Sequence, residues 1–288
     1  MTTHDTSYLD KQIHLDEVVE QIRDLPTLPA VAMDVLNSID NEDIDISILA
    51  QKIAKDQALT AKTLRFANSS LYGSQTKVCS IQQAISLLGV RGVRNLITTA
   101  ALSSCFPETP CKNFEYKVFW RHTLATAVCA KVLARHLRLN QDIAFTAGLL
   151  HDIGRLVLVT HFTHRYEVAL AYRAAHDCYL LDAERTVLGL DHATIGHVLA
   201  QHWHFSENIQ NAIAGHEEPD AMGNSSIASL IHVANAIVHG LDFAKAEDEL
   251  VPPVSIVAWH GVGLDSASYM RVFRETELAF NEMNRILS

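Results

Sequence analysis

The sequence Gly148-Leu149-Leu150-His151-Asp152-Ile153-Gly154-Arg155 decides the fold of this chain, because a histidine and an aspartate stand together directly after an apolar run. Imidazole and carboxylate groups both offer lone pairs, so His151 and Asp152 can bind one divalent metal ion. The alternative is a helix end, where Asp152 caps free backbone amides and His151 is satisfied in the core. Gly154 allows a sharp turn and leaves room beside the pair. The histidines elsewhere in the chain favour the metal-binding interpretation.

Four other segments each place a polar side chain among small or apolar residues, and these are His122, His192, His216 and Asn235. Helical bundles build metal sites in this way, from inward-facing side chains on several helices. Gly196 lies one turn after His192 and would let a second helix approach closely. The sequence therefore predicts one shared pocket that contains His122, His151, Asp152, His192, His216 and Asn235.

Hydrophobic spacing predicts helices throughout the chain and favours an all-α fold. Of its 288 residues 48% are hydrophobic, and only 12 glycines and 7 prolines interrupt the pattern. No stretch alternates with the period of two that a strand requires. The predicted helices cover residues 30–39, 46–55, 58–67, 80–88, 90–105, 118–137, 142–150, 155–174, 180–188, 192–203, 207–215, 226–239, 255–260 and 268–287. Leu88-Gly89 is a typical helix C-terminus.

The stretch 106–113 contains two prolines and no periodicity, so we place a boundary there. The predicted organisation is a lead-in (1–19), an N-terminal helical subdomain (20–105), a linker (106–116), a histidine-rich helical subdomain (117–242) and a C-terminal helical extension (243–288).

Composition narrows the class of protein. A formal net charge of −10 argues against broad nucleic-acid binding. The five cysteines form no Cys-x-x-Cys pair, which favours reduced thiols over disulfides or a structural zinc site. The polar, acidic N-terminus does not resemble a signal peptide, and no apolar run approaches the roughly 20 residues that span a bilayer. We therefore expect a cytoplasmic protein without membrane contact.

Residues 57–105 contain no acidic residue, and they carry five basic ones. Lys62 and Arg65 are three residues apart, and Arg91 and Arg94 repeat that spacing at a helix start. Free backbone amides at such a start can receive a phosphate or an acidic partner. The alternative is a solvated face that balances nearby acidic residues.

The order of the histidines and the aspartate resembles the HD superfamily of metal-dependent phosphohydrolases. The resemblance assigns the first histidine of that family to His122 and its His-Asp pair to His151 and Asp152. The cyclic-dinucleotide branch, HD-GYP, has additional histidines, which match His192 and His216.

Several positions depart from that pattern. Asn235 stands where the late aspartate belongs, and Gly215 replaces the first of two adjacent histidines. Arg155 replaces a lysine, which changes the geometry of phosphate binding. Val118 offers no carboxylate, and no Gly-Tyr-Pro follows His216.

These departures resemble a narrower group, the HDOD domain, which is the HD-related output domain of bacterial signalling. Its N-terminal signature is present as Leu25-Pro26-Thr27-Leu28-Pro29, Asp56, Leu59-Thr60, Lys62, Leu64-Arg65, Ala67-Asn68-Ser69, Tyr72-Gly73, Ile81, Ala84-Ile85 and Leu87-Leu88-Gly89. The resemblance runs from about residue 20 to about residue 240.

The resemblance implies a bacterial regulatory protein that contacts a signalling partner and has a degenerate metal site with little or no hydrolase activity. A neutral amide at Asn235 weakens the binding of a divalent ion, which could be Fe, Mn, Mg, Zn or Ni. One alternative is an active phosphohydrolase on a nucleotide or cyclic dinucleotide, with His151, Asp152 and Arg155 as its catalytic candidates. Another is a nucleic-acid-binding regulator that uses Lys62, Arg65, Arg91 and Arg94.

Overall fold

The computed structural model describes residues 6–25, 28, 33–34, 51, 53, 60–61, 63–64, 78–223, 226–245 and 250–287. In this part of the chain every regular element is a helix, so the predicted all-α fold is confirmed. The elements are η1 (Thr6–Lys11), α1 (Leu15–Arg23), α5 (Ile81–Cys105), α6 (Tyr116–Leu137), α7 (Gln141–Leu150), α8 (Ile153–His161), α9 (Thr163–His176), α10 (Leu180–Leu188), α11 (His192–His202), α12 (Glu207–Gly215), η3 (Pro219–Met222), α13 (Ser226–Gly240), α14 (Ile256–Val262) and α15 (Ser266–Leu287).

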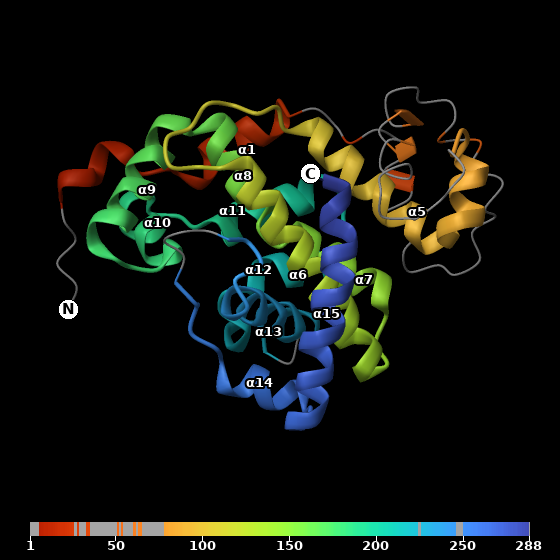
Figure 1. The fold of residues 1–288 in the computed structure, drawn as a ribbon. Helices are drawn as coiled ribbons and strands as arrows, with labels where there is room; N and C mark the ends of the chain where they lie inside the picture. The colour runs from red at the N-terminus through yellow and green to blue at the C-terminus, as the bar shows by residue number, and fades with distance from the viewer. Residues whose placement is uncertain are drawn as a thin grey trace.

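Helix α6 is the central element, and α7, α13 and α15 pack along it (Figure 1). Its middle is buried and rich in small residues, which lets neighbouring backbones approach closely. Gly148 in α7 uses this space, since a Cβ built on it would lie 2.7 Å from the Ala127 Cα. The approach brings the end of α7, where His151 lies, next to the middle of α6.

Two helix boundaries follow from single residues. Gly89 interrupts α5 with φ 72° and ψ 170°, where the sequence predicts one helix to end and the next to begin. The prediction of one helix over residues 155–174 is wrong, because the chain breaks at Phe162. Phe162 has φ −124°, and its ring is buried in the core. Burial of this ring outweighs the helical periodicity on both sides of it.

Within residues 1–19, the predicted lead-in, the described part contains η1 and the start of α1. Helix α1 packs on α11, and η1 packs on α10. Arg165 in α9 donates two hydrogen bonds to the Glu17 carboxylate, at 2.8 and 2.6 Å. These residues are therefore held against the histidine-rich half of the chain. The predicted domain boundaries stay predictions.

The segment Gln141–His161 is long and apolar enough to cross a membrane by length and composition, with a mean hydropathy of 1.4. It comprises α7 and α8 and is 89% buried inside the protein. It also carries His151, Asp152 and Arg155, which face other protein groups. These features are those of a core helix pair, not of a lipid-facing span.

Candidate metal centre

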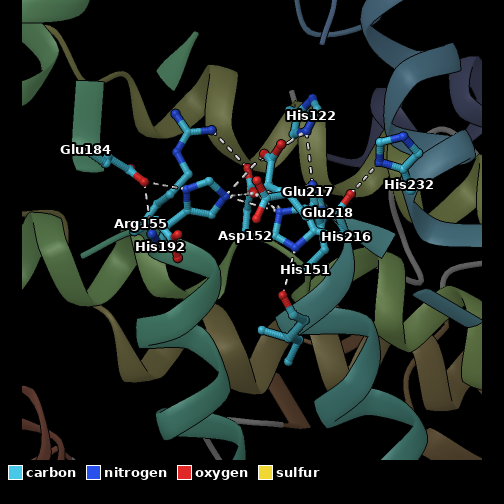
Figure 2. A network of polar contacts seen from close by, with 12 residues as sticks. His122, His151, Asp152, Arg155, Glu184, His192, His216, Glu217, Glu218 and His232 are labelled. Atoms are coloured by element: carbon cyan, nitrogen blue, oxygen red, sulfur yellow. Dashed lines mark hydrogen bonds and ion pairs between the residues drawn. The ribbon is translucent and has the colours of Figure 1, made fainter. Parts of the chain in front are cut away.

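Five helices bring the predicted polar residues into one buried place (Figure 2). His122 lies in the middle of α6, and the His151-Asp152 pair forms the junction between α7 and α8. His192 begins α11, and His216 directly follows α12. All five side chains are buried, with exposed fractions of 0–4%. Four stretches far apart in the sequence therefore supply one cluster.

The cluster consists of two groups that share Asp152. In the first group, His122 Nε2 lies 3.2 Å from His151 Nε2, and His151 Nε2 lies 3.4 Å from Asp152 Oδ1. His122 Nε2 is 3.9 Å from the other carboxylate oxygen, Oδ2. These three residues could hold one ion.

In the second group, His192 Nε2 and His216 Nε2 lie 3.1 Å apart. They lie 3.3 and 3.4 Å, respectively, from the same oxygen, Asp152 Oδ1. Asp152 can therefore act as a third ligand beside His192 and His216. Asp152 Oδ1 is the atom on which the cluster converges.

Hydrogen bonds on the outer side of the rings fix the orientation of three imidazoles. His151 Nδ1 is 2.7 Å from the Gly148 carbonyl oxygen, and His216 Nδ1 is 2.8 Å from that of Ile213. A carbonyl only accepts, so each Nδ1 carries a proton and each Nε2 faces inward. His192 Nδ1 lies 2.6 Å from Glu184 Oε2. This arrangement is typical of metal-binding histidines.

Sequence reasoning missed two acidic residues of the centre. Glu184 in α10 is fully buried and also accepts the backbone N–H of His192 at 2.9 Å. Glu217 Oε1 lies 3.5 Å from His192 Nε2 and 3.6 Å from His216 Nε2. Glu217 could have been found, because it directly follows a candidate ligand. Glu184 lies eight residues before His192 on a separate helix, and no motif identifies it.

Arg155 is bound to the shared carboxylate. Its Nη1 donates to Asp152 Oδ2 at 2.9 Å, and its Nε donates to the Tyr166 hydroxyl at 3.3 Å. The rings of Phe114 and Phe119 each lie 5.7 Å from the guanidinium carbon. Aromatic faces attract a cation at this distance, so Arg155 is held firmly in place.

The helix-end interpretation of Asp152 does not describe this structure. Asp152 occupies the N-cap position of α8, but its side chain caps no backbone amide. Its oxygens face the histidines and Arg155 instead. Asn235, from α13, is also buried, and its Oδ1 has no hydrogen-bond partner. An unpartnered buried oxygen beside this cluster fits a role as a donor to an ion.

Two glycines allow the close approach of α8 and α11. A Cβ built on Gly154 would lie 2.0 Å from the His192 carbonyl oxygen and 2.7 Å from the Gly196 nitrogen. The predicted closeness at Gly196 is therefore present. Gly154 itself is helical and makes no sharp turn, so only the missing side chain matters there.

Burial and neighbouring charges shift the pKa values in the centre. Burial lowers the pKa of His122 and of His151 to about 3, so both rings are neutral at pH 7. Burial disfavours the charged form of Asp152, yet the His151 and Arg155 side chains hold its pKa well below the usual range. Burial likewise opposes protonation of His192, but Glu184 and Asp152 outweigh it and raise its pKa.

The donor set fits a divalent ion. Three imidazoles present fixed Nε2 atoms, the His122 ring adds a fourth, and Asp152 and Glu217 supply ionised oxygens. The pKa of Glu217 is lowered to about 2, because contacts with His192 and His216 outweigh the cost of its burial. Nitrogen and oxygen donors of this kind suit Zn, Fe, Mn and Ni.

Comparisons with known proteins identify the family of this chain. Residues 25–219 match the model of the HDOD domain. The chain belongs to the HDOD family. An HDOD domain protein from Geobacter sulfurreducens has the same fold, with a TM-score of 0.77, 22% identity and coverage of 94% of this chain and 97% of that one.

Two further proteins are similar to this chain. A candidate phosphohydrolase from Shewanella amazonensis superimposes with a TM-score of 0.72 and 25% identity, covering 93% of this chain and 96% of that one. A protein of Treponema pallidum is 27% identical over 231 residues, which are 78% of this chain. This chain spans 44% of the length of the Treponema protein.

A cavity of about 330 Å³ opens beside the HDOD centre. Asp152, His192, Glu217 and Asn235 line its inner end. Its wall also contains the arginines Arg155, Arg173 and Arg185, and the apolar residues Leu180, Pro252 and Pro253. The cavity gives a small ligand access to the buried cluster. It also contains His239, whose ring lies 4.6 Å from that of His122.

The predicted basic site in the N-terminal half is not supported at Arg94. The Arg94 side chain is buried, and its Nη1 lies 3.4 Å from Asp142 Oδ2. A buried guanidinium that holds α5 against α7 cannot bind a phosphate from solution. Arg91 lies in α5, and its side chain, like Lys62 and Arg65, falls outside the described residues.

Proposed function

We propose that this HDOD protein is a regulatory component of signalling, in which the His-Asp centre binds a divalent ion for recognition or stability and hydrolyses phosphate esters little or not at all. The family membership supports the signalling role. The chemistry of the donor atoms supports binding of an ion at His122, His151, Asp152, His192, His216 and Asn235.

The bond between Arg155 and Asp152 Oδ2 carries this proposal. Hydrolysis at a two-ion site requires two ions about 3.5–4 Å apart, and a cation already bound at Asp152 Oδ2 repels a second ion there. Here a guanidinium already neutralises Oδ2. Asn235 is a neutral amide and adds no charge to compensate. Both features favour binding over turnover.

We further propose that the protein acts by contacts with a signalling partner. A contact through the basic segment 57–105, as predicted, cannot use Arg94, because its side chain is buried. The C-terminal helices offer another surface, because four apolar side chains there are 59–73% exposed, namely Ile256, Val257, Met270 and Leu278. Exposed apolar side chains mark an interaction surface where they form a contiguous patch.

The test combines metal analysis with a hydrolysis assay. Freshly purified full-length protein is analysed for metal by mass spectrometry and assayed with bis(p-nitrophenyl) phosphate and with a cyclic dinucleotide. We expect bound metal and a hydrolysis rate equal to that of His151→Ala. Metal-dependent turnover that His151→Ala abolishes would overturn the proposal.

The second candidate is an active metal-dependent phosphohydrolase, and the cavity favours it. Arginine side chains on its wall suit phosphate, and its inner end reaches Asp152 and His192. In this case the bound ions would supply an activated water. Arg155 would release Asp152 and bind a phosphate group of the substrate instead. The same hydrolysis assay separates the two candidates.

A further inference from the structure

The second group of the centre has the dimensions of a closed tetrahedral site. Atoms that bind a tetrahedral zinc ion at about 2.0–2.2 Å lie about 3.3–3.6 Å from one another. His192 Nε2, His216 Nε2 and Asp152 Oδ1 form one face of such a tetrahedron, with edges of 3.1, 3.3 and 3.4 Å. Glu217 Oε1 lies 3.5 and 3.6 Å from the two nitrogens and is the candidate for the fourth corner.

The first group does not have these dimensions. His122 approaches Asp152 through Oδ2, at 3.9 Å, whereas His151 approaches through Oδ1, at 3.4 Å. Oδ2 also accepts the hydrogen bond from Arg155. The positive charge of Arg155 therefore lies beside the Asp152 oxygen that a second ion would have to bind.

The charges balance with a single ion. Three carboxylates surround the second group, on Asp152, Glu184 and Glu217, and Glu184 binds the outer nitrogen of His192. One divalent ion and the Arg155 guanidinium together supply three positive charges. A second ion would leave a buried excess of positive charge, which is costly at low dielectric.

We propose that the centre binds one tetrahedral Zn²⁺ ion through Asp152, His192, His216 and Glu217, and that Arg155 takes the place of a second ion. This inference rests on the proposed function and specifies its site. Four protein ligands fill the tetrahedron, as in structural zinc sites, whereas catalytic sites leave one position open. Glu217 is the ligand that completes the set.

The test is a binding experiment that does not depend on activity. Full-length protein is stripped of metal with a chelator, and Zn²⁺ binding is then measured by calorimetry. We expect one ion per chain, and at least a tenfold loss of affinity in Glu217→Gln. The matched control is Glu218→Gln, because Glu218 is exposed and bonds to Arg185 at 2.8 Å instead of facing the cluster. We expect no change of affinity in this control.

Co²⁺ reports the geometry directly. Tetrahedral Co²⁺ absorbs visible light far more strongly than octahedral Co²⁺, so the wild-type spectrum should be intense and that of Glu217→Gln weaker. Two ions bound with similar affinity, or an unchanged affinity in Glu217→Gln, would overturn the inference. Rapid hydrolysis by a chain that binds one ion would overturn the proposed function alone, so the two failures are distinguishable.

Discussion

Gly154→Ala should both destabilise the protein and weaken its metal centre. The new Cβ would lie 2.0 Å from the His192 carbonyl oxygen, which is more than 1 Å inside an ordinary contact. The obstacle is backbone, so no side-chain rotation can relieve it and α8 must move away from α11. Overpacking of this kind costs about 1–3 kcal/mol. Because the clash is with a backbone atom, we expect a cost near the upper end of that range. Alanine regains up to about 1 kcal/mol of helix propensity.

The expected net loss is therefore about 2 kcal/mol in the free energy of unfolding, measured by urea denaturation of the metal-free protein. Calorimetry should also show weaker Zn²⁺ binding, because the movement separates His192 from Asp152. Gly261→Ala is the matched control, since Gly261 is also helical and a Cβ there meets no atom within 4 Å. If Gly154→Ala equals the wild type in both stability and affinity, the close contact between α8 and α11 does not position the centre.

Three further substitutions test other contacts. Glu184→Gln should lower Zn²⁺ affinity about 10–100-fold in calorimetry, because it weakens the bond that orients an imidazole ligand; unchanged affinity would contradict this role. Arg94→Ala should lower the free energy of unfolding by about 3 kcal/mol, because Asp142 loses a buried cationic partner, whereas a truly exposed arginine would cost almost nothing. Glu17→Gln should cost up to about 1 kcal/mol at pH 7, since the hydrogen bonds from Arg165 lower the pKa of Glu17 from 4.5. The lowered pKa of Glu17 in the folded state stabilises the protein above pH 4.5, and this stabilisation is lost as the pH falls through the folded-state pKa. The difference in stability between Glu17→Gln and the wild type, measured by urea denaturation, should therefore shrink at about pH 3. A difference that grows on acidification would refute the assignment.

The helices were predictable where one apolar face continues without interruption. The sequence predicts α10 and α12 at the observed bounds; Gly189 follows α10 in the left-handed conformation, and Ser206 precedes α12. The break at Phe162 was not predictable, since helical periodicity continues across it and only the shape of the core decides it. Short elements such as η1 depend on packing against α10 and leave no periodic pattern.

The sequence identifies most residues of the centre as candidates, but it does not predict which of their atoms contact one another. His151 and Asp152 form a recognisable pair, and histidines in apolar helices are rare enough to notice. The sequence does not show which Asp152 oxygen faces which ring, or that Arg155 bonds to one of them. Arg94 was misjudged because a charged residue on a helix is usually exposed, and Asp142, its partner, lies 48 residues away.

Helix α15 begins 47 residues after the end of the region that matches the family, yet it packs along α6, which carries His122. Asn235 in α13 also lies beyond that region. A gene fragment trimmed at residue 219 would leave one flank of α6 uncovered and would omit a wall of the cavity. A version of this domain made for expression should therefore keep the residues after 219, because they cover α6 and line the cavity.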